Sequence, residues 1–162
     1  MTGWVKNDGG RAAAGYRGRA GDCVVRSVAI ASGLPYREVY DALSHGARTQ
    51  RQTKYSRVKP SSARDGVQTS RKWFRDYMTS IGFRWVPMMK IGGGCRVHLN
   101  AAELPPGRLV VSVSRHYTAV LDGVIHDDHD PRRPMVQTTP DNPTPRRIET
   151  RCVYGIWIKE ET

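Results

Sequence analysis

The chain lacks the features of a membrane-spanning or exported protein. It has 162 residues, and no stretch approaches the roughly eighteen consecutive apolar residues that a membrane span requires. Its first residues contain no apolar core of the kind found in secretory signals. Only three cysteines are present, Cys23, Cys95 and Cys152, which are too few and too widely spaced for a disulfide scaffold. We therefore expect packed thiols, a reducing compartment and a soluble, cytoplasmic protein.

Length and composition favour one domain covering residues 1–162. A hydrophobic content of 38% is enough for one core but not for two. Residues 1–21 are rich in glycine, and we predict that they form an irregular arm over the surface. We find no internal repeat.

Positive charge is concentrated in residues 46–66. The formal net charge of the chain is +11, and this segment holds six basic residues against the single acidic Asp65: Arg48, Arg51, Lys54, Arg57, Lys59 and Arg64. The segment has almost no apolar residues, so we predict a mobile basic loop that binds an anionic substrate or another anion. The alternative is a loop that only aids solubility.

The order of secondary structure predicts an α+β fold. Apolar patterns indicate helices that begin at residues 23, 35 and 71, with Asp22 as the N-cap of the first and Gly33 at its end. Short β-branched or aromatic segments follow at 83–86, 109–113, 117–121, 124–127 and 152–158, and a loop is expected at 131–147. Helices followed by strands are typical of N-terminal helices packed on a C-terminal antiparallel sheet.

A hairpin turn places a histidine beside a carboxylate. Asp122-Gly123 stands between two apolar segments and predicts a two-residue type I′ turn. In that register Thr118 faces Asp127, so His116 and Asp127 share one face of the hairpin as diagonal neighbours. The hairpin thus offers a base and a group that orients it. A bulge would exchange Asp127 for Asp128, and His116 alone could instead cap its strand.

Cys23 has the position of an activated thiol. A cysteine at the first turn of a helix lies at the positive end of the backbone dipole, where the thiolate is favoured. With a histidine and an orienting carboxylate, Cys23 would complete a catalytic triad of the kind used for acyl transfer from amides and thioesters. The alternative is a small, buried apolar side chain.

The order of these residues resembles that of the papain-like cysteine peptidases and the related cell-wall amidases. Segments 21–31 (GDCVVRSVAIA), 114–127 and 151–157 also resemble an uncharacterised group of small phage and bacterial proteins. The resemblance implies a papain-like fold in which Cys23 is the nucleophile, His116 the general base and then acid, and Asp127 the orienting group. It further implies a bacterial host cell or a virion as the location.

One element of the papain-like pattern is missing. Papain-like enzymes have a glutamine before the cysteine that helps to bind the oxyanion, and no glutamine precedes Cys23. The donor role could pass to Asn7, to backbone N–H groups near Cys23, or to nothing. Cys95 and His98, like His126 and His129, have the spacing of a zinc ligand pair. Residues three apart in a strand point to opposite faces, so His126 and His129 do not share a metal easily, and we expect Cys95 to be a packed thiol. We therefore expect no metal and no cofactor.

Two functions are consistent with these features. The first is a cysteine hydrolase that acts on a peptide, protein or cell-wall peptide through Cys23, His116 and Asp127. The second is a catalytically weak or inactive scaffold that binds nucleic acid or virion components through the basic loop. Neither hypothesis requires contact with a membrane.

Overall fold

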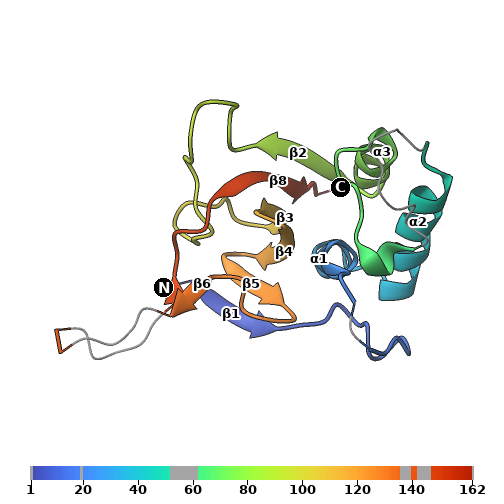
Figure 1. The fold of residues 1–162 in the computed structure, drawn as a ribbon, viewed down its shortest axis with the longest axis horizontal. Helices are drawn as coiled ribbons and strands as arrows, with labels where there is room; N and C mark the ends of the chain where they lie inside the picture. The colour runs from blue at the N-terminus through green and yellow to red at the C-terminus, as the bar shows by residue number, and fades with distance from the viewer. Residues whose placement is uncertain (1, 19, 52–61, 136–139, 142–146, 162) are drawn as a thin grey trace.

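The computed structural model describes residues 2–18, 20–51, 62–135, 140–141 and 147–161, and its fold is α+β (Figure 1). The helices are α1 (Cys23–Ser32), α2 (Tyr36–Thr49) and α3 (Lys72–Ser80), with a short 3₁₀ helix η1 (Ala63–Asp65). The strands are β1 (Gly3–Lys6), β2 (Phe83–Pro87), β3 (Arg108–Val113), β4 (His116–Leu121), β5 (Val124–Asp127), β6 (Arg133–Met135), β7 (Arg147–Ile148) and β8 (Val153–Lys159). The predicted α+β class is therefore confirmed.

The main sheet is mixed rather than purely antiparallel. Its six strands lie in the order β1-β5-β4-β3-β8-β2, and β1 runs parallel to its neighbour β5 while the other pairs are antiparallel. The prediction of an irregular arm is wrong for Gly3–Lys6, which form β1. All four residues of β1 are exposed, so the strand has no hydrophobic alternation that the sequence could reveal.

The β4–β5 hairpin has the predicted register. Leu121 pairs with Val124, and Ala119 pairs with His126. Asp122 has φ 46° and Gly123 has φ 80°, as a type I′ turn requires at both central residues. This register brings the start of β4 close to the end of β5, where His116 and Asp127 lie.

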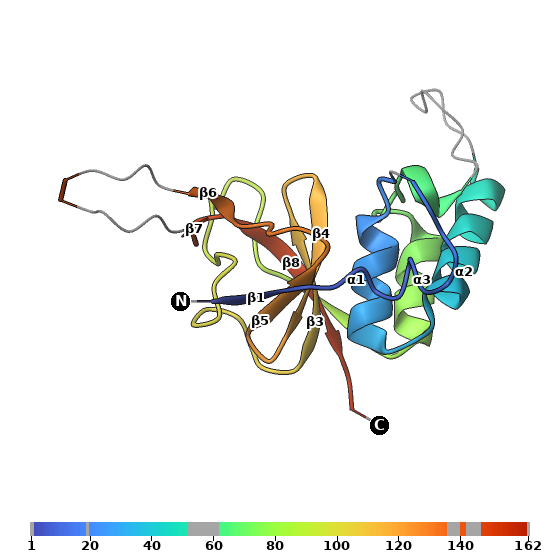
Figure 2. The ribbon, with the colours of Figure 1, turned by 90° about the horizontal axis from the view of Figure 1, so that it is seen from below.

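Apolar residues cover both faces of the sheet. The three helices lie together on one side of it (Figures 1 and 2), and the core between them includes Val25, Val28, Leu43, Phe74 and Trp157. A second core on the opposite face contains Leu99, Leu109, Val111, Ile125 and Ile156. Eight of the ten residues of α1 are buried, in agreement with the prediction of a central helix.

The predicted loop at 46–66 is shorter than expected. Helix α2 continues through Gly46 to Thr49. The ring of Trp73 packs against Gly46, where an added Cβ would lie 2.2 Å from a ring atom, so only glycine fits at this position of the helix. The chain returns to the core at Ala63, which is fully buried and whose N–H donates to Ser44 Oγ at 2.9 Å. Arg48 therefore lies on α2, whereas Lys54, Arg57 and Lys59 lie outside the described residues.

Two more predictions are corrected in the second half of the chain. Cys95 and Cys152 form a disulfide instead of two separate thiols, because a β-bridge between His98 and Cys152 brings their segments together. The expected loop at 131–147 contains β6, which pairs with β7 in a small second sheet. In the described part of the chain, no helix is long and apolar enough to cross a membrane.

Candidate active site

Cys23 is the first residue of α1 and is partly buried. Asp22, before it, does not cap the helix as predicted. Its buried carboxylate instead accepts hydrogen bonds from Arg26 and Tyr36, and it lies 3.3 Å from Arg11 Nε. The charge of Asp22 is thus balanced by two guanidinium groups, and the first backbone amides of α1 receive no hydrogen bond from its side chain.

His116 begins β4 and is held by the carboxylate of Asp127. The distance from His116 Nε2 to Asp127 Oδ2 is 2.7 Å, and the two side chains are only 10% and 4% exposed. Because Asp127 uses Nε2, the other ring nitrogen, Nδ1, is left for the thiol of Cys23. The pair predicted from the hairpin register is therefore present.

The carboxylate of Asp127 is fixed by several contacts. Thr118 Oγ1 donates to Oδ2 at 2.6 Å, and the backbone N–H of Asp128 donates to Oδ1 at 2.7 Å. Burial would raise the pKa of Asp127, but the hydrogen bond and charge of His116 outweigh it, so the pKa is lowered. Asp128 has an exposed side chain, which resolves the choice between the two carboxylates in favour of Asp127 as the partner of His116.

Cys23 and His116 form an electrostatic pair. Burial would raise the pKa of the Cys23 thiol, but the hydrogen bond and charge of His116, the backbone N–H of Tyr117 and the charge of Arg26 lower it overall. Burial would likewise lower the pKa of His116, but hydrogen bonds and charge from Asp127 and Cys23 raise it to about 9. Both directions favour the charged forms of the pair, a thiolate beside an imidazolium.

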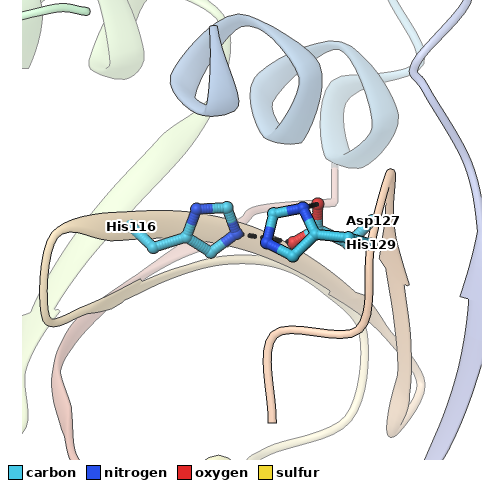
Figure 3. Close-up of side chains that lie close together, drawn as sticks. All are labelled: His116, Asp127 and His129. Carbon is cyan, nitrogen blue, oxygen red and sulfur yellow. Dashed lines mark hydrogen bonds and ion pairs between the residues drawn. The ribbon is translucent and has the colours of Figure 1, made fainter. Parts of the chain in front are cut away.

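A second histidine lies near the other carboxylate oxygen of Asp127. His129 Nδ1 is 3.9 Å from Asp127 Oδ1, and its ring centroid is 5.0 Å from that of His116. Figure 3 shows the Asp127 carboxylate with one interaction to each imidazole. The ligand atoms of the three residues lie within 4.8 Å of one another, close enough to hold a metal ion. A cation bound through His116 Nε2 would displace the proton that this nitrogen shares with Asp127, so the two arrangements exclude each other.

The thiol and imidazole face an open cavity of about 500 Å³. Its walls come from the N-terminal end of α1, the β3–β4 turn, the segment after η1 and β8: Gly21, Cys23, Val24, Gly66, Val67, Thr69, Ser112, Val113, Arg115, His116, Tyr117 and Tyr154. A second cavity of about 310 Å³ adjoins it, because Thr69, Ser112, Tyr117 and Tyr154 line both. An extended substrate could therefore cross the thiol and continue toward Trp85 and Trp157.

Backbone amides, not Asn7, are the oxyanion donors available near the thiol. The Asn7 side-chain amide lies 3.3 Å from His126 Nδ1, its Oδ1 accepts from Gly9 N–H, and Asn7 does not line the cavity. The N–H groups of Cys23 and Val24 belong to the first turn of α1, where no intrahelical acceptor exists. These two donors belong to the turn that begins with the thiol-bearing residue, at the positive end of the helix dipole.

The predicted anion-binding residues do not gather at this cavity. Of the six, Arg48, Arg51 and Arg64 are described, and none of them lines it. The residues that the sequence reasoning missed are Thr118, His129 and Arg115. The predicted hairpin register already places Thr118 opposite Asp127, whereas nothing in the local sequence pointed to Arg115.

No protein-family model matches the chain, and neither a curated protein nor a solved structure shows significant similarity to it.

Proposed function

We propose that the chain is a papain-like cysteine hydrolase that cleaves an amide or peptide bond with Cys23 as nucleophile. The observation that carries this proposal is that Cys23 and His116 line one open cavity while His116 is hydrogen-bonded to the buried carboxylate of Asp127. The disulfide-free state of Cys23 supports it, since a nucleophile must be a free thiolate.

The first half of the reaction transfers the acyl group to the enzyme. The Cys23 thiolate attacks the substrate carbonyl carbon, and the carbonyl electrons move to an oxyanion that accepts hydrogen bonds from the N–H groups of Cys23 and Val24. As the oxyanion collapses, the carbon–nitrogen bond breaks and the His116 imidazolium gives its proton to the leaving amine. A thioester and a neutral imidazole remain.

The second half returns the enzyme to its starting state. Neutral His116 takes a proton from a water molecule, whose oxygen attacks the thioester carbon. The carbon–sulfur bond then breaks, which releases the carboxylic acid and restores the thiolate opposite the imidazolium. Asp127 keeps Nδ1 of His116 directed at the sulfur and stabilises the positive ring in both halves.

Thiol alkylation tests the proposal without knowledge of the substrate. We expect iodoacetamide to modify Cys23 at neutral pH at least tenfold faster than a free cysteine peptide, as is usual for an activated thiolate. A rate no faster than that of the peptide would disprove the activated thiolate. Cys23→Ser should keep the fold, measured by circular dichroism, and lose turnover of any peptide or cell-wall peptide that the wild type cleaves.

A second candidate function is the binding of an anionic polymer such as nucleic acid, in the host cell or in a virion. It is favoured by the net charge of +11 and by a surface pocket lined by Arg132, Arg133 and Arg151. Salt-sensitive retention on DNA that is weakened by Arg133→Gln would support this role. Retention that this substitution leaves unchanged would remove the pocket as its basis.

A further inference from the structure

The cleft beside the proposed nucleophile carries charge of one sign at its rim. The two adjoining cavities contain the side chains of Arg115 and Arg75, and the described residues that line them include no aspartate or glutamate. The protonated His116 adds a third positive charge next to the thiolate. A negatively charged ligand would meet no like charge along this surface other than the thiolate itself.

Arg115 stands next to the imidazole in a position that few arginines occupy. With Ser114 it forms the two-residue turn between β3 and β4, and Val113 pairs directly with His116 across that turn. Its φ of 56° lies in the left-handed region, which favours glycine or asparagine over a long side chain. The turn is also tied down, because Arg151 donates to Ser114 O at 2.5 Å and to Pro131 O at 2.7 Å.

The guanidinium of Arg115 is available for a ligand. Its side chain is exposed at the cavity that contains Cys23, and no carboxylate among the described residues forms an ion pair with it. Two other arginines near this end of the sheet are engaged: Arg132 binds Asp130 at 2.8 Å, and Arg151 holds the backbone of the turn. Among the described residues, Arg115 is thus the arginine at the wall of the Cys23 cavity, and it has no protein partner there.

We propose that Arg115 selects substrates that carry a carboxylate close to the bond attacked by Cys23. This inference rests on the proposed hydrolase function and narrows its substrate to an acidic peptide or peptide-like amide. A guanidinium binds a carboxylate through two parallel N–H donors, which fixes the direction of the ligand as well as attracting it. Tyr117 and Tyr154 line both cavities, and Trp85, Trp157 and Arg75 line the second, where the rest of such a ligand would lie.

Two alkylating reagents that differ in charge test this inference. Iodoacetate carries a carboxylate next to its reactive carbon, whereas iodoacetamide is neutral and of nearly the same size. The quantity measured is the rate with iodoacetate divided by the rate with iodoacetamide. We expect this rate ratio to be higher for Cys23 than for a free cysteine peptide, and we expect Arg115→Gln to lower it by about three- to tenfold. Added salt should reduce the ratio for the wild type.

Matched variants separate the local charge from the overall charge. Arg48→Gln removes one positive charge from α2, away from both cavities, and should leave the ratio unchanged. Arg115→Lys keeps the positive charge and should retain part of the wild-type rate ratio. Glycine suits the φ of 56°, so Arg115→Gly is expected to fold at least as well as the wild type. Its rate ratio should nevertheless fall as far as that of Arg115→Gln.

The outcomes distinguish this inference from the proposed function. Slow reaction of the wild type with both reagents would disprove the activated thiolate and the inference with it. Fast reaction with iodoacetamide, together with a ratio that neither Arg115→Gln nor Arg115→Gly changes, would overturn only the role of Arg115. An equal fall of the ratio in Arg48→Gln would also overturn it, because the effect would then come from net charge.

Discussion

Replacing Asp127 by asparagine should weaken the thiolate of Cys23 although the two residues are not neighbours. The substitution keeps the size of the side chain but removes the charge that faces His116 Nε2 at 2.7 Å. Burial, which lowers the pKa of His116, is then no longer offset by the charge of Asp127, so that pKa falls. A neutral imidazole no longer stabilises the thiolate, so the thiol form of Cys23 gains at neutral pH.

The size of this effect follows from the pKa of His116. Its rise from 6.5 to about 9 corresponds to roughly 3 kcal/mol in favour of the imidazolium, at about 1.4 kcal/mol for each pKa unit. After burial, which acts in the opposite direction, the hydrogen bond to Asp127 is the largest influence, and Cys23 supplies a smaller part. If Asp127→Asn removes about half of these 3 kcal/mol, the population of the thiolate–imidazolium pair falls by roughly tenfold.

The assay is the rate of iodoacetamide modification as a function of pH, followed by mass spectrometry of the Cys23 peptide. We expect Asp127→Asn to react about tenfold more slowly near neutral pH and to regain the wild-type rate in alkaline solution, where any thiol ionises. Asp128→Asn is the matched control, because its exposed side chain makes no bond to His116. Equal pH profiles for the wild type and Asp127→Asn would refute the reasoning.

Two further predictions concern pH and the disulfide. Since the pKa of His116 is raised on folding, its contribution to stability is full below about pH 6.5 and is lost as the pH rises through about 9, which denaturant unfolding at several pH values can measure. A constant free energy of unfolding across that window would contradict it. Replacing Cys95 and Cys152 by serine opens a loop closed over 57 residues and should lower the free energy of unfolding by about 4 kcal/mol. Alkylation of Cys23 in this variant should keep its wild-type rate, and a large loss there would show that the disulfide also shapes the site.

Local signals in the sequence predict most of the elements that position the candidate site. The turn at Asp122-Gly123 sets the register of β4 and β5 by itself, so the pairing of His116 with Asp127 needs no knowledge of the rest of the fold. The apolar pattern of α1 likewise predicts a buried helix that begins at Cys23. That these two units meet depends on packing between distant segments, and the order of the residues only hinted at it.

The features that sequence reasoning missed arise from contacts over long separations. The Cys95–Cys152 bond joins segments whose spacing alone does not indicate pairing. Asp22 is a favourable N-cap by residue type, but its carboxylate accepts hydrogen bonds from Arg26 and Tyr36 instead of from the backbone of α1. Arg115 reaches the cavity through the conformation of its turn, which no hydrophobic pattern records.

The parallel strand β1 gives the N-terminal segment a direct part in holding the carboxylate. It lines the outer side of β5 with main-chain hydrogen bonds, and Asn7 N–H extends the ladder by donating to the carbonyl of Asp127 at 2.8 Å. The strand that bears Asp127 is therefore clamped between two neighbours instead of lying at the rim of the sheet. Detaching the clamp, by proteolysis after Lys6 or by a bulky fusion, would leave both hydrophobic cores intact while freeing the residue that aims the imidazole.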